Sequence, residues 1–274
     1  MSLFVAGAIV LGTSAVMVGA MLFVRRGAPE GSRFTDGDRA SGIFGVLSGG
    51  FALLLGFVVF LAFTKYDDTR AGAEAEALAV LQQFETAQLM PEEARARLSG
   101  ELICYGRSVV RREWPALDDG REVDQINSWG VRLFRTLQTI EPTANSEQSA
   151  YDQWLGLTQA REQARRDRLH AADGIVPLPV WIVLFFTAVL ILVYVLFFAD
   201  SGESAAAQGV MAGSVAAVVA ASLLVLVALN HPYESSIGGL PPAAMERTLA
   251  IVDEARADLG LDEMPPCDET GAAR

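Results

Sequence analysis

Few side chains in this sequence have the types and spacing that chemistry needs. The chain has two cysteines and two histidines, too few for a disulfide framework or a cysteine-based zinc site. Adjacent acids occur at Asp67 with Asp68 and at Asp118 with Asp119, and both pairs are typical of solvated surface charge. No phosphate-binding loop, nucleophile elbow or His-Glu-x-x-His motif is present in the sequence. We therefore predict no enzyme, no cofactor and no metal site.

Basic residues form two groups that could meet anions. Arg111 and Arg112 stand at a predicted helix end, where positive charge complements the helix dipole. The second group precedes the third apolar run and consists of Arg161, Arg165, Arg166 and Arg168. The simpler interpretation of this group is a topology anchor that faces anionic headgroups, and the alternative is a ligand site.

Composition and hydropathy indicate which elements must position these residues. The net charge is −12, yet 51% of the residues are hydrophobic and the mean hydropathy is +0.32. This combination excludes a disordered protein and a basic nucleic-acid-binding protein, so we predict no nucleic-acid partner. The excess hydropathy lies in four long uncharged runs, at residues 3–24, 41–64, 175–199 and 204–229. A helix of about 22 residues spans roughly 33 Å, so each run predicts a membrane-spanning helix.

The runs divide the chain into four segments. Residues 1–64 are a first transmembrane hairpin, 65–173 a helical cytosolic domain, 174–230 a second hairpin, and 231–274 a cytosolic tail with a short helix. The predicted helices outside the runs are 71–89, which continues the second spanning helix, 91–114, 123–140, 147–171 and 241–259. Helix 91–114 should stop at Trp114 because Pro115 follows. The predicted fold class is therefore an all-α integral membrane protein.

Basic residues near the membrane predict the orientation. The loop at residues 25–40 carries Arg25, Arg26, Arg33 and Arg39. The opposite side carries Lys65, Arg70, Arg161, Arg165, Arg166, Arg168 and Arg247. Seven basic residues against four place both termini and residues 65–173 in the cytoplasm.

The second spanning run contains two periodic patterns. Small residues recur at Gly45, Gly49, Ala52 and Gly56, a spacing that lets helices approach closely. Bulkier residues recur on a neighbouring face at Leu53, Phe57, Phe60 and Thr64. This second pattern fits either lipid-facing bulk or an apolar constriction that lines a pore. The spanning runs contain no acidic or basic side chain, which argues against a proton-relay pump or an ion-coupled transporter.

Several motifs resemble those of a known family. Leu55-Gly56-Phe57, followed by Thr64-Lys65, resembles the bestrophin pore helix, and Asn230 with Pro232-Tyr233 resembles the bestrophin Asn-Pro-Phe element. The whole chain more closely resembles a bacterial family grouped as bestrophin-like. The residues that carry this resemblance are Arg25, Arg26, Tyr105, Val109, Val110, Glu113, Trp114, Pro115, Pro232 and Tyr233.

The resemblance implies a homo-oligomeric ion channel, pentameric as bestrophins are, in the bacterial plasma membrane. Its partners would be further copies of itself, membrane lipids and inorganic ions. The implied neck residues on the second helix are Leu53, Phe57 and Phe60, with Gly49 and Gly56 beside them, and the implied cytosolic pore mouth is Thr64 and Lys65. Tyr105, Glu113, Trp114, Pro115, Asn230, Pro232 and Tyr233 are the implied structural motif.

This chain also departs from bestrophins. Gly49 takes a position where bestrophins have a bulky aliphatic residue, and residues 234–238 lack the acidic run of the animal calcium clasp. The competing hypothesis is a non-conducting membrane scaffold or sensor whose helical domain binds a partner.

Overall fold

The computed structural model describes residues 2–31, 33–121, 123, 127–170, 172, 174–234, 238–261 and 263–274. These described residues are nearly all helical and contain no strand beyond one isolated bridge between Cys267 and Ala273. They divide into two compact units. The transmembrane unit consists mainly of Met1–Lys65 and Gly174–His231. The helical unit consists mainly of Tyr66–Asp173 and Gly239–Arg274, together with Pro232, Tyr233 and Glu234.

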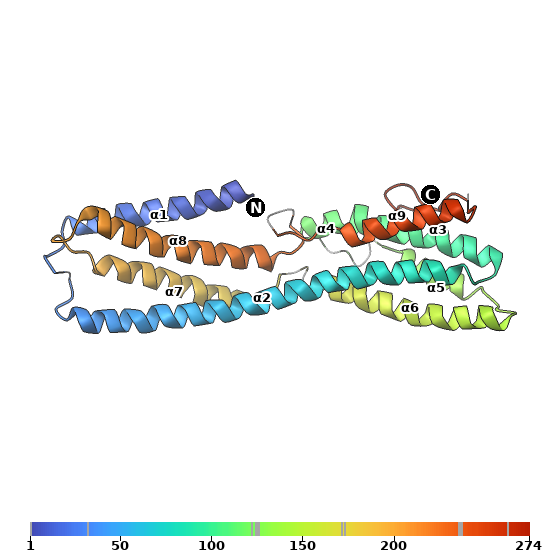
Figure 1. The fold of residues 1–274 in the computed structure, drawn as a ribbon, viewed down its shortest axis with the longest axis horizontal. Helices are drawn as coiled ribbons and strands as arrows, with labels where there is room; N and C mark the ends of the chain where they lie inside the picture. Colours follow the sequence, from blue (N-terminus) through green and yellow to red (C-terminus); the bar gives the residue numbers. More distant parts are fainter. Residues whose placement is uncertain are drawn as a thin grey trace. The chain divides into compact units, whose positions relative to one another are not determined.

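The four predicted spanning helices are present (Figure 1). They are α1 (Leu3–Arg25), α2 (Gly37–Ala87), α7 (Leu178–Phe197) and α8 (Ala205–Asn230), each long and apolar enough to cross a membrane. Helix α2 is a single element that continues from the transmembrane unit into the helical unit. The predicted all-α membrane fold is therefore confirmed.

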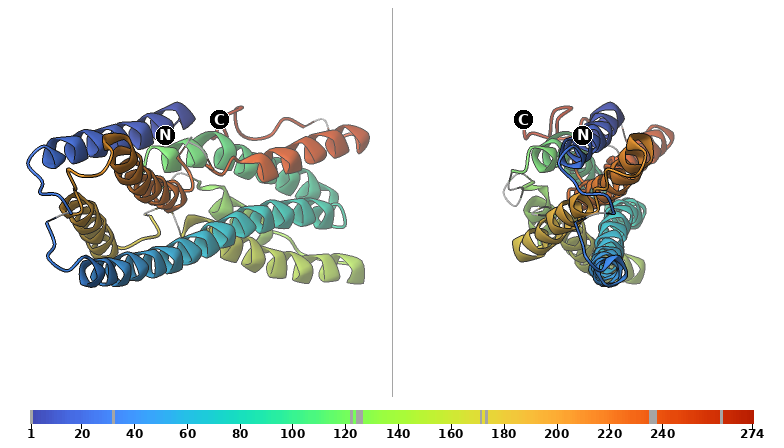
Figure 2. Two further views of the ribbon diagram at one scale, coloured as in Figure 1. Left: turned by 60° about the vertical axis from the view of Figure 1, so that its left-hand side comes forward. Right: turned by 90° about the vertical axis from the view of Figure 1, so that its left-hand side faces the viewer.

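Helices α1 and α8 pack closely against each other (Figure 2). A Cβ atom added at Gly213 would lie 2.9 Å from Val18 Cγ2, and one at Gly209 would lie 3.4 Å from Val18 Cγ1. Ala212 and Ala216 are fully buried on the same face of α8. Small side chains at this face are what allow the two backbones to approach.

A second core of the transmembrane unit joins α2 to α7 and α8. Its buried residues are Phe51, Leu55, Val58, Ala62, Leu184, Ala188, Ile191, Val219, Leu223 and Leu226. At the end of α8, Asn230 Oδ1 accepts hydrogen bonds from the backbone N–H groups of Ile175 at 2.9 Å and Val176 at 2.7 Å. This amide therefore fixes the chain where it enters α7.

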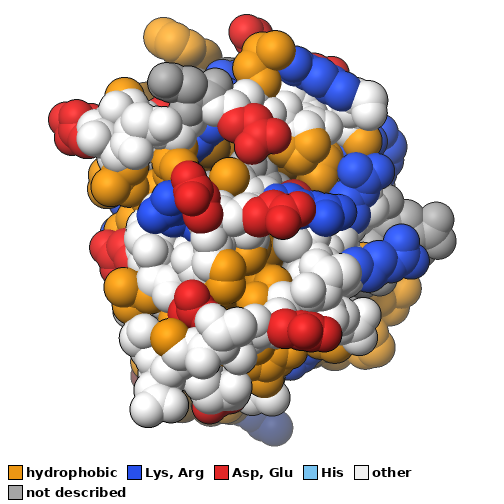
Figure 3. Space-filling view, turned by 90° about the vertical axis from the view of Figure 1, so that its right-hand side faces the viewer, with side chains coloured by type: hydrophobic (Ala, Val, Ile, Leu, Met, Phe, Trp, Pro, Cys, Tyr) orange, Lys and Arg blue, Asp and Glu red, His pale blue; other side chains and the backbone are white. Residues whose placement is uncertain are grey.

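The helical unit contains the second half of α2 and the shorter helices. These are α3 (Glu92–Ser108), η1 (Val109–Glu113), α4 (Trp114–Asp118), α5 (Trp129–Leu137), α6 (Asn145–Leu169) and α9 (Ala243–Asp258). Trp129, Leu133 and Leu137 recur at helical spacing along α5 and are all buried. Helix α5 is shorter than the predicted 123–140, of which residues 124–126 lie outside the described residues. Figure 3 shows acidic, basic and hydrophobic side chains on the end face of the helical unit, with most of the basic ones toward the right-hand side of the view.

The helix that contains Trp114 does not stop there, so the predicted end was wrong. The chain passes from α3 through the π-helical segment η1 into α4, and Pro115 lies in the first turn of α4. The N–H of Trp114 donates to the carbonyl of Val109, five residues back. Proline has no backbone N–H to donate, and in a regular α-helix this would leave one carbonyl without its hydrogen bond. The π turn shifts the hydrogen-bond register at this point, so the chain stays helical as far as Asp118.

The two cysteines form a disulfide, which their number and spacing in the sequence do not predict. Cys104 of α3 bonds to Cys267, 163 residues later in the sequence. Cys267 belongs to the C-terminal clasp, the name used here for residues 265–274, which follow α9 without forming a helix. Two cysteines are too few for a framework of several disulfides. A single disulfide requires only that the two residues lie close together, and the fold brings Cys104 and Cys267 together.

Candidate functional site

One face of α2 in the transmembrane unit is bulky, apolar and unpacked. Leu53 is 77% exposed, Phe57 60% and Phe60 64%. Because successive helical residues are about 100° apart, these three side chains point away from the packed face of the same helix. That packed face consists of Phe51, Leu55, Val58 and Ala62. The structure therefore brings the predicted neck residues onto one free face of a continuous helix.

The glycines beside this face contact no neighbouring helix. A Cβ atom added at Gly45, Gly49 or Gly56 would meet no described atom within 4 Å outside the helix's own neighbouring residues. The close helix approach that this spacing favours is made within the chain by Gly209 and Gly213 of α8 instead. Among the described residues, the surface at these α2 glycines is therefore left open.

A groove of about 630 Å³ runs between α2 and α8 beside this face. Its described lining is apolar apart from three serines, Ser48, Ser214 and Ser222. Each serine hydroxyl donates to a carbonyl one turn earlier in its own helix. The groove thus presents no charged group to a solute.

The predicted pore mouth lies at the end of the transmembrane unit. Thr64 is on the same face of α2 as Phe57, seven residues later, and its hydroxyl donates to the carbonyl of Phe60 at 3.0 Å. Lys65 follows and is exposed. A basic side chain therefore stands one residue beyond the apolar face.

The family motif gathers around a buried charge cluster in the helical unit, formed by Glu76, Glu113, Arg165 and Arg168. Arg165 Nη2 lies 3.1 Å from Glu113 Oε1. The Arg168 guanidinium bridges the two carboxylates, with Nη2 at 3.2 Å from Glu76 Oε1 and a close bond to Glu113 Oε2. Glu76, Glu113 and Arg168 are fully buried.

Aromatic residues of the motif enclose this cluster. The Tyr105 hydroxyl donates to Glu76 Oε1 at 2.5 Å, and the Tyr233 hydroxyl donates to the backbone carbonyl of Arg168. The Arg168 guanidinium lies 5.3 Å from the centre of the Trp114 ring, and this ring meets Tyr233 edge-on at 5.4 Å. The Trp114 Nε1–H donates to the carbonyl of Leu240 at 2.8 Å. Three motif residues, Glu113, Trp114 and the distant Tyr233, therefore meet at Arg168, and Tyr105 joins them through Glu76.

Burial and nearby charges shift the pKa values of Arg168 and Tyr105 at this cluster. Burial alone would lower the pKa of Arg168, but the charges of Glu76 and Glu113 outweigh it and raise that pKa well above its usual value. Burial, followed by the nearby charge of Glu76, raises the pKa of Tyr105 well above its usual value. Glu76, Glu113 and Arg168 are buried and ion-paired, so the cluster holds α2, η1 and α6 together.

Two arginines predicted to face lipid headgroups are buried in the helical unit. Arg168 forms the centre of the charge cluster, and Arg161 Nη1 donates to Gln83 Oε1 at 2.9 Å. Arg165 pairs with Glu113, and only Arg166 of the predicted group is exposed. The headgroup-anchor interpretation was therefore wrong for Arg161 and Arg168. Helical spacing places residues 161, 165 and 168 on one face, and two buried glutamates from other helices make that face internal.

The remaining motif residues lie elsewhere. Pro115 belongs to α4, and the carbonyl of Pro232 accepts a hydrogen bond from the N–H of Leu240 at 2.7 Å. Asn230 anchors the start of α7 in the transmembrane unit. The motif is thus a set of structural contacts rather than one site. Among the described residues, no group of three or more His, Cys, Asp or Glu side chains could hold a metal ion.

Comparison with known proteins identifies the relatives of this arrangement. The sequence pattern of the Bestrophin-like domain matches residues 11–238. The chain belongs to the bestrophin-like family. Solved structures similar to this bestrophin-like chain include two variants of a bacterial bestrophin homologue from Klebsiella pneumoniae.

One of these variants has a TM-score of 0.69 at 13% identity, and the match covers 89% of this chain and 98% of that chain. The other has a TM-score of 0.67 at 14% identity with the same coverage. At this level of identity the likeness establishes a shared fold. No protein of curated function matches the sequence significantly.

Proposed function

We propose that this bestrophin-like protein is an ion channel, assembled from several copies of the chain in the bacterial plasma membrane. Helix α2 of each copy would line the neck, and a pentamer is the proposed assembly. The observation that carries the proposal is the face of α2 with Leu53, Phe57 and Phe60, which is bulky, apolar and unpacked within the chain. Family membership supports the same function.

The proposed neck works by excluding water. Leu53 and Phe57 are one helical turn apart, so in a symmetric assembly they form two stacked apolar rings. Water leaves a narrow apolar constriction, and an ion there has neither hydration nor a protein ligand. Gly49 would leave the ring beyond Leu53 wider, so the barrier would depend on Leu53 and Phe57.

The proposed assembly uses surfaces that the single chain leaves unpacked. Gly45, Gly49 and Gly56 could receive a helix from a neighbouring copy without steric conflict. The permeating species would be inorganic ions, and the outer faces of α1, α7 and α8 would contact lipid.

A non-conducting scaffold or sensor is the competing function. The observation in its favour is that the free face of α2 and the adjoining groove are apolar, with serine hydroxyls bonded inside their own helices. Lipid acyl chains could cover such an apolar surface without leaving any polar group unpaired. The helical unit would then be the functional part and would bind a partner.

Conductance of the purified protein in planar bilayers separates the two functions. Phe57→Ala, and more strongly Phe57→Ala with Leu53→Ala, should raise conductance or open probability because water can enter a wider constriction. Phe186→Ala is the matched control, since Phe186 of α7 is 66% exposed and lies outside the proposed neck.

The conductance results distinguish a channel from a scaffold only if the oligomeric state of each variant is measured as well. Cross-linking or native mass measurement should show an intact oligomer for wild type and all variants. Silent wild type and silent neck variants in an intact oligomer would reject the channel and favour the scaffold. Equal conductance gains in Phe57→Ala and Phe186→Ala would place the barrier outside the proposed neck.

A further inference from the structure

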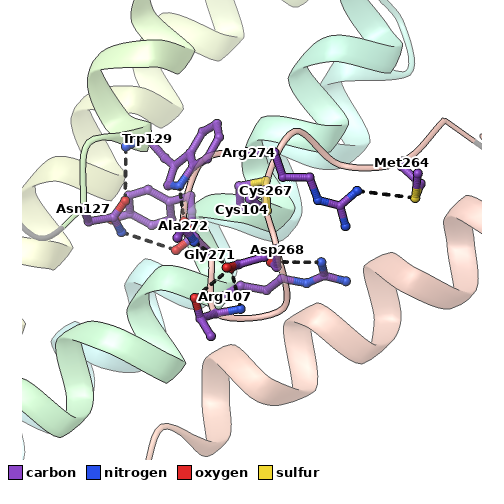
Figure 4. The surroundings of a disulfide bond; sticks show 12 residues. Cys104, Arg107, Asn127, Trp129, Met264, Cys267, Asp268, Gly271, Ala272 and Arg274 are labelled. Carbon is purple, nitrogen blue, oxygen red and sulfur yellow. Dashed lines mark hydrogen bonds between the residues drawn. A yellow bond between two sulfur atoms is a disulfide. The ribbon is translucent and has the colours of Figure 1, made fainter.

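The C-terminal clasp is an ordered loop docked on the helical unit (Figure 4). Asp268 Oδ1 accepts bonds from the Thr270 N–H, the Thr270 hydroxyl and the Ala272 N–H, at 2.7–2.9 Å. The Asp268 N–H donates to the carbonyl of Ala272 at 2.9 Å, which closes the loop. The clasp is therefore held by its own polar groups rather than by a core of its own.

The docking surface fits the clasp closely. The Trp129 Nε1–H donates to the carbonyl of Gly271 at 2.7 Å. Gly271 has a φ of +79°, and a Cβ atom there would lie 2.4 Å from the backbone nitrogen of Ser108, so no other residue fits this position. Figure 4 shows Cys267 facing Cys104 beside these contacts.

The cysteine pair has the properties of a structural disulfide. The Cα atoms are 5.7 Å apart, and both side chains are fully buried. A redox-active pair needs a partly exposed sulfur in an electropositive setting, whereas these sulfurs are covered by the clasp. Structural disulfides form and persist outside the cytoplasm, because cytoplasmic thiols are kept reduced.

The number of basic residues on each side of the membrane does not oppose this. Three of the seven basic residues that predicted a cytoplasmic helical unit, Arg161, Arg165 and Arg168, are committed to contacts inside that unit. The residues that remain from that set are Lys65, Arg70, Arg166 and Arg247. In the loop at residues 25–40, Arg25 is likewise bonded to the backbone carbonyls of Ser201 and Glu203, which leaves Arg26, Arg33 and Arg39. Four basic residues against three no longer decide the orientation.

The length of each segment then decides the orientation. Basic residues set orientation mainly through short loops, and long domains are translocated largely regardless of charge. The short segment is the arginine-containing loop at residues 25–40, and the long segment is residues 65–173. When the short loop is given the greater weight, its arginines place residues 25–40 in the cytoplasm.

We infer that the helical unit lies on the extracytoplasmic side of the membrane, where the Cys104–Cys267 disulfide secures the clasp. The bond forms by thiol–disulfide exchange with an oxidised dithiol protein of the cell envelope. The two cysteine thiols lose two electrons and two protons, one S–S bond forms between them, and the S–S bond of the oxidant is reduced to two thiols. Both termini then lie outside the cytoplasm, the reverse of the orientation predicted from the sequence. This inference does not depend on whether the protein conducts ions.

Thiol trapping of the native protein provides the first test. Cells expressing the full chain are quenched in acid, denatured, and treated with a maleimide that adds mass. Wild type should show no mass shift before reduction and a shift of two labels after it, whereas Cys267→Ser should show one label without reduction. Two labels on unreduced wild type would overturn the inference.

Site-directed labelling provides an independent test that does not use the native cysteines. Asp119, whose side chain is 65% exposed, is replaced by cysteine in one variant, and Gly37 in another. In intact spheroplasts a membrane-impermeant maleimide should label Asp119→Cys, and Gly37→Cys only after lysis. The opposite pattern would overturn the inference. If neither variant is labelled, the thiol-trapping result decides.

Discussion

At the scale of single residues, Arg168 is the centre of the helical unit. It is buried between Glu76 and Glu113, so its removal leaves two carboxylates with too little compensating charge. Breaking a buried ion pair in this way costs about 3–5 kcal/mol. We expect Arg168→Met to lower the melting temperature of the full chain in detergent strongly, and the exposed Arg166→Met to leave it near wild type. Equal melting temperatures for the two variants would show that the cluster contributes little stability.

The same cluster makes a prediction about alkaline pH. Burial raises the pKa of Tyr105 well above its usual value, and burial also raises the pKa of Tyr233. A raised pKa in the folded state contributes stability that is complete below the unfolded value of about 10 and is lost as pH rises beyond it. Absorbance near 295 nm should therefore show both phenols ionising only as the protein unfolds. Tyr105→Phe and Tyr233→Phe should each reduce that late step, and a reduction of an earlier step instead would contradict the prediction.

At the scale of elements, the pairing of α1 with α8 depends on glycine at the contact. Gly213 has no room for a side chain because Val18 lies where a Cβ would be. We expect Gly213→Leu to destabilise the transmembrane unit by about 1–3 kcal/mol through overpacking. Gly12→Leu is the control, since a Cβ at Gly12 of α1 meets nothing within 4 Å. Thermal unfolding in detergent should separate the two variants, and equal melting temperatures would show that α1 can move away at no cost.

At the scale of the whole molecule, the disulfide joins residues that are 163 apart in the sequence. The chain-entropy model gives about 5 kcal/mol as an upper value for a loop of this length. Reductant should therefore lower the denaturant midpoint of wild type once unfolding begins to expose the bond. The double variant Cys104→Ser with Cys267→Ser should have the lower denaturant midpoint from the start, and reductant should not change it. A wild-type midpoint that stays unchanged after complete reduction would mean that the clasp contacts suffice.

The sequence by itself determined the membrane architecture. Uncharged runs of spanning length and apolar residues at helical spacing are local properties, so α1, α2, α7, α8 and the buried face of α5 could be predicted without a fold. The free face of α2 was also predictable as a pattern, because periodicity places Leu53, Phe57 and Phe60 together. Whether that face lines a pore is a property of an assembly, which periodicity cannot specify.

Tertiary structure decided the contacts between distant parts of the chain. Sequence spacing could not reveal that Arg168 meets Glu76 and Glu113, because the residues lie on three separate helical segments, and so the arginines were assigned to the membrane surface. The sequence predicts a helix end at Pro115, but a proline's effect depends on the hydrogen-bond register before it, which here is a π turn. Cys104 and Cys267 could not be paired from the sequence, since a disulfide requires proximity in space. Each of these features depends on which residues the fold brings together, and that is settled only when all the helices pack.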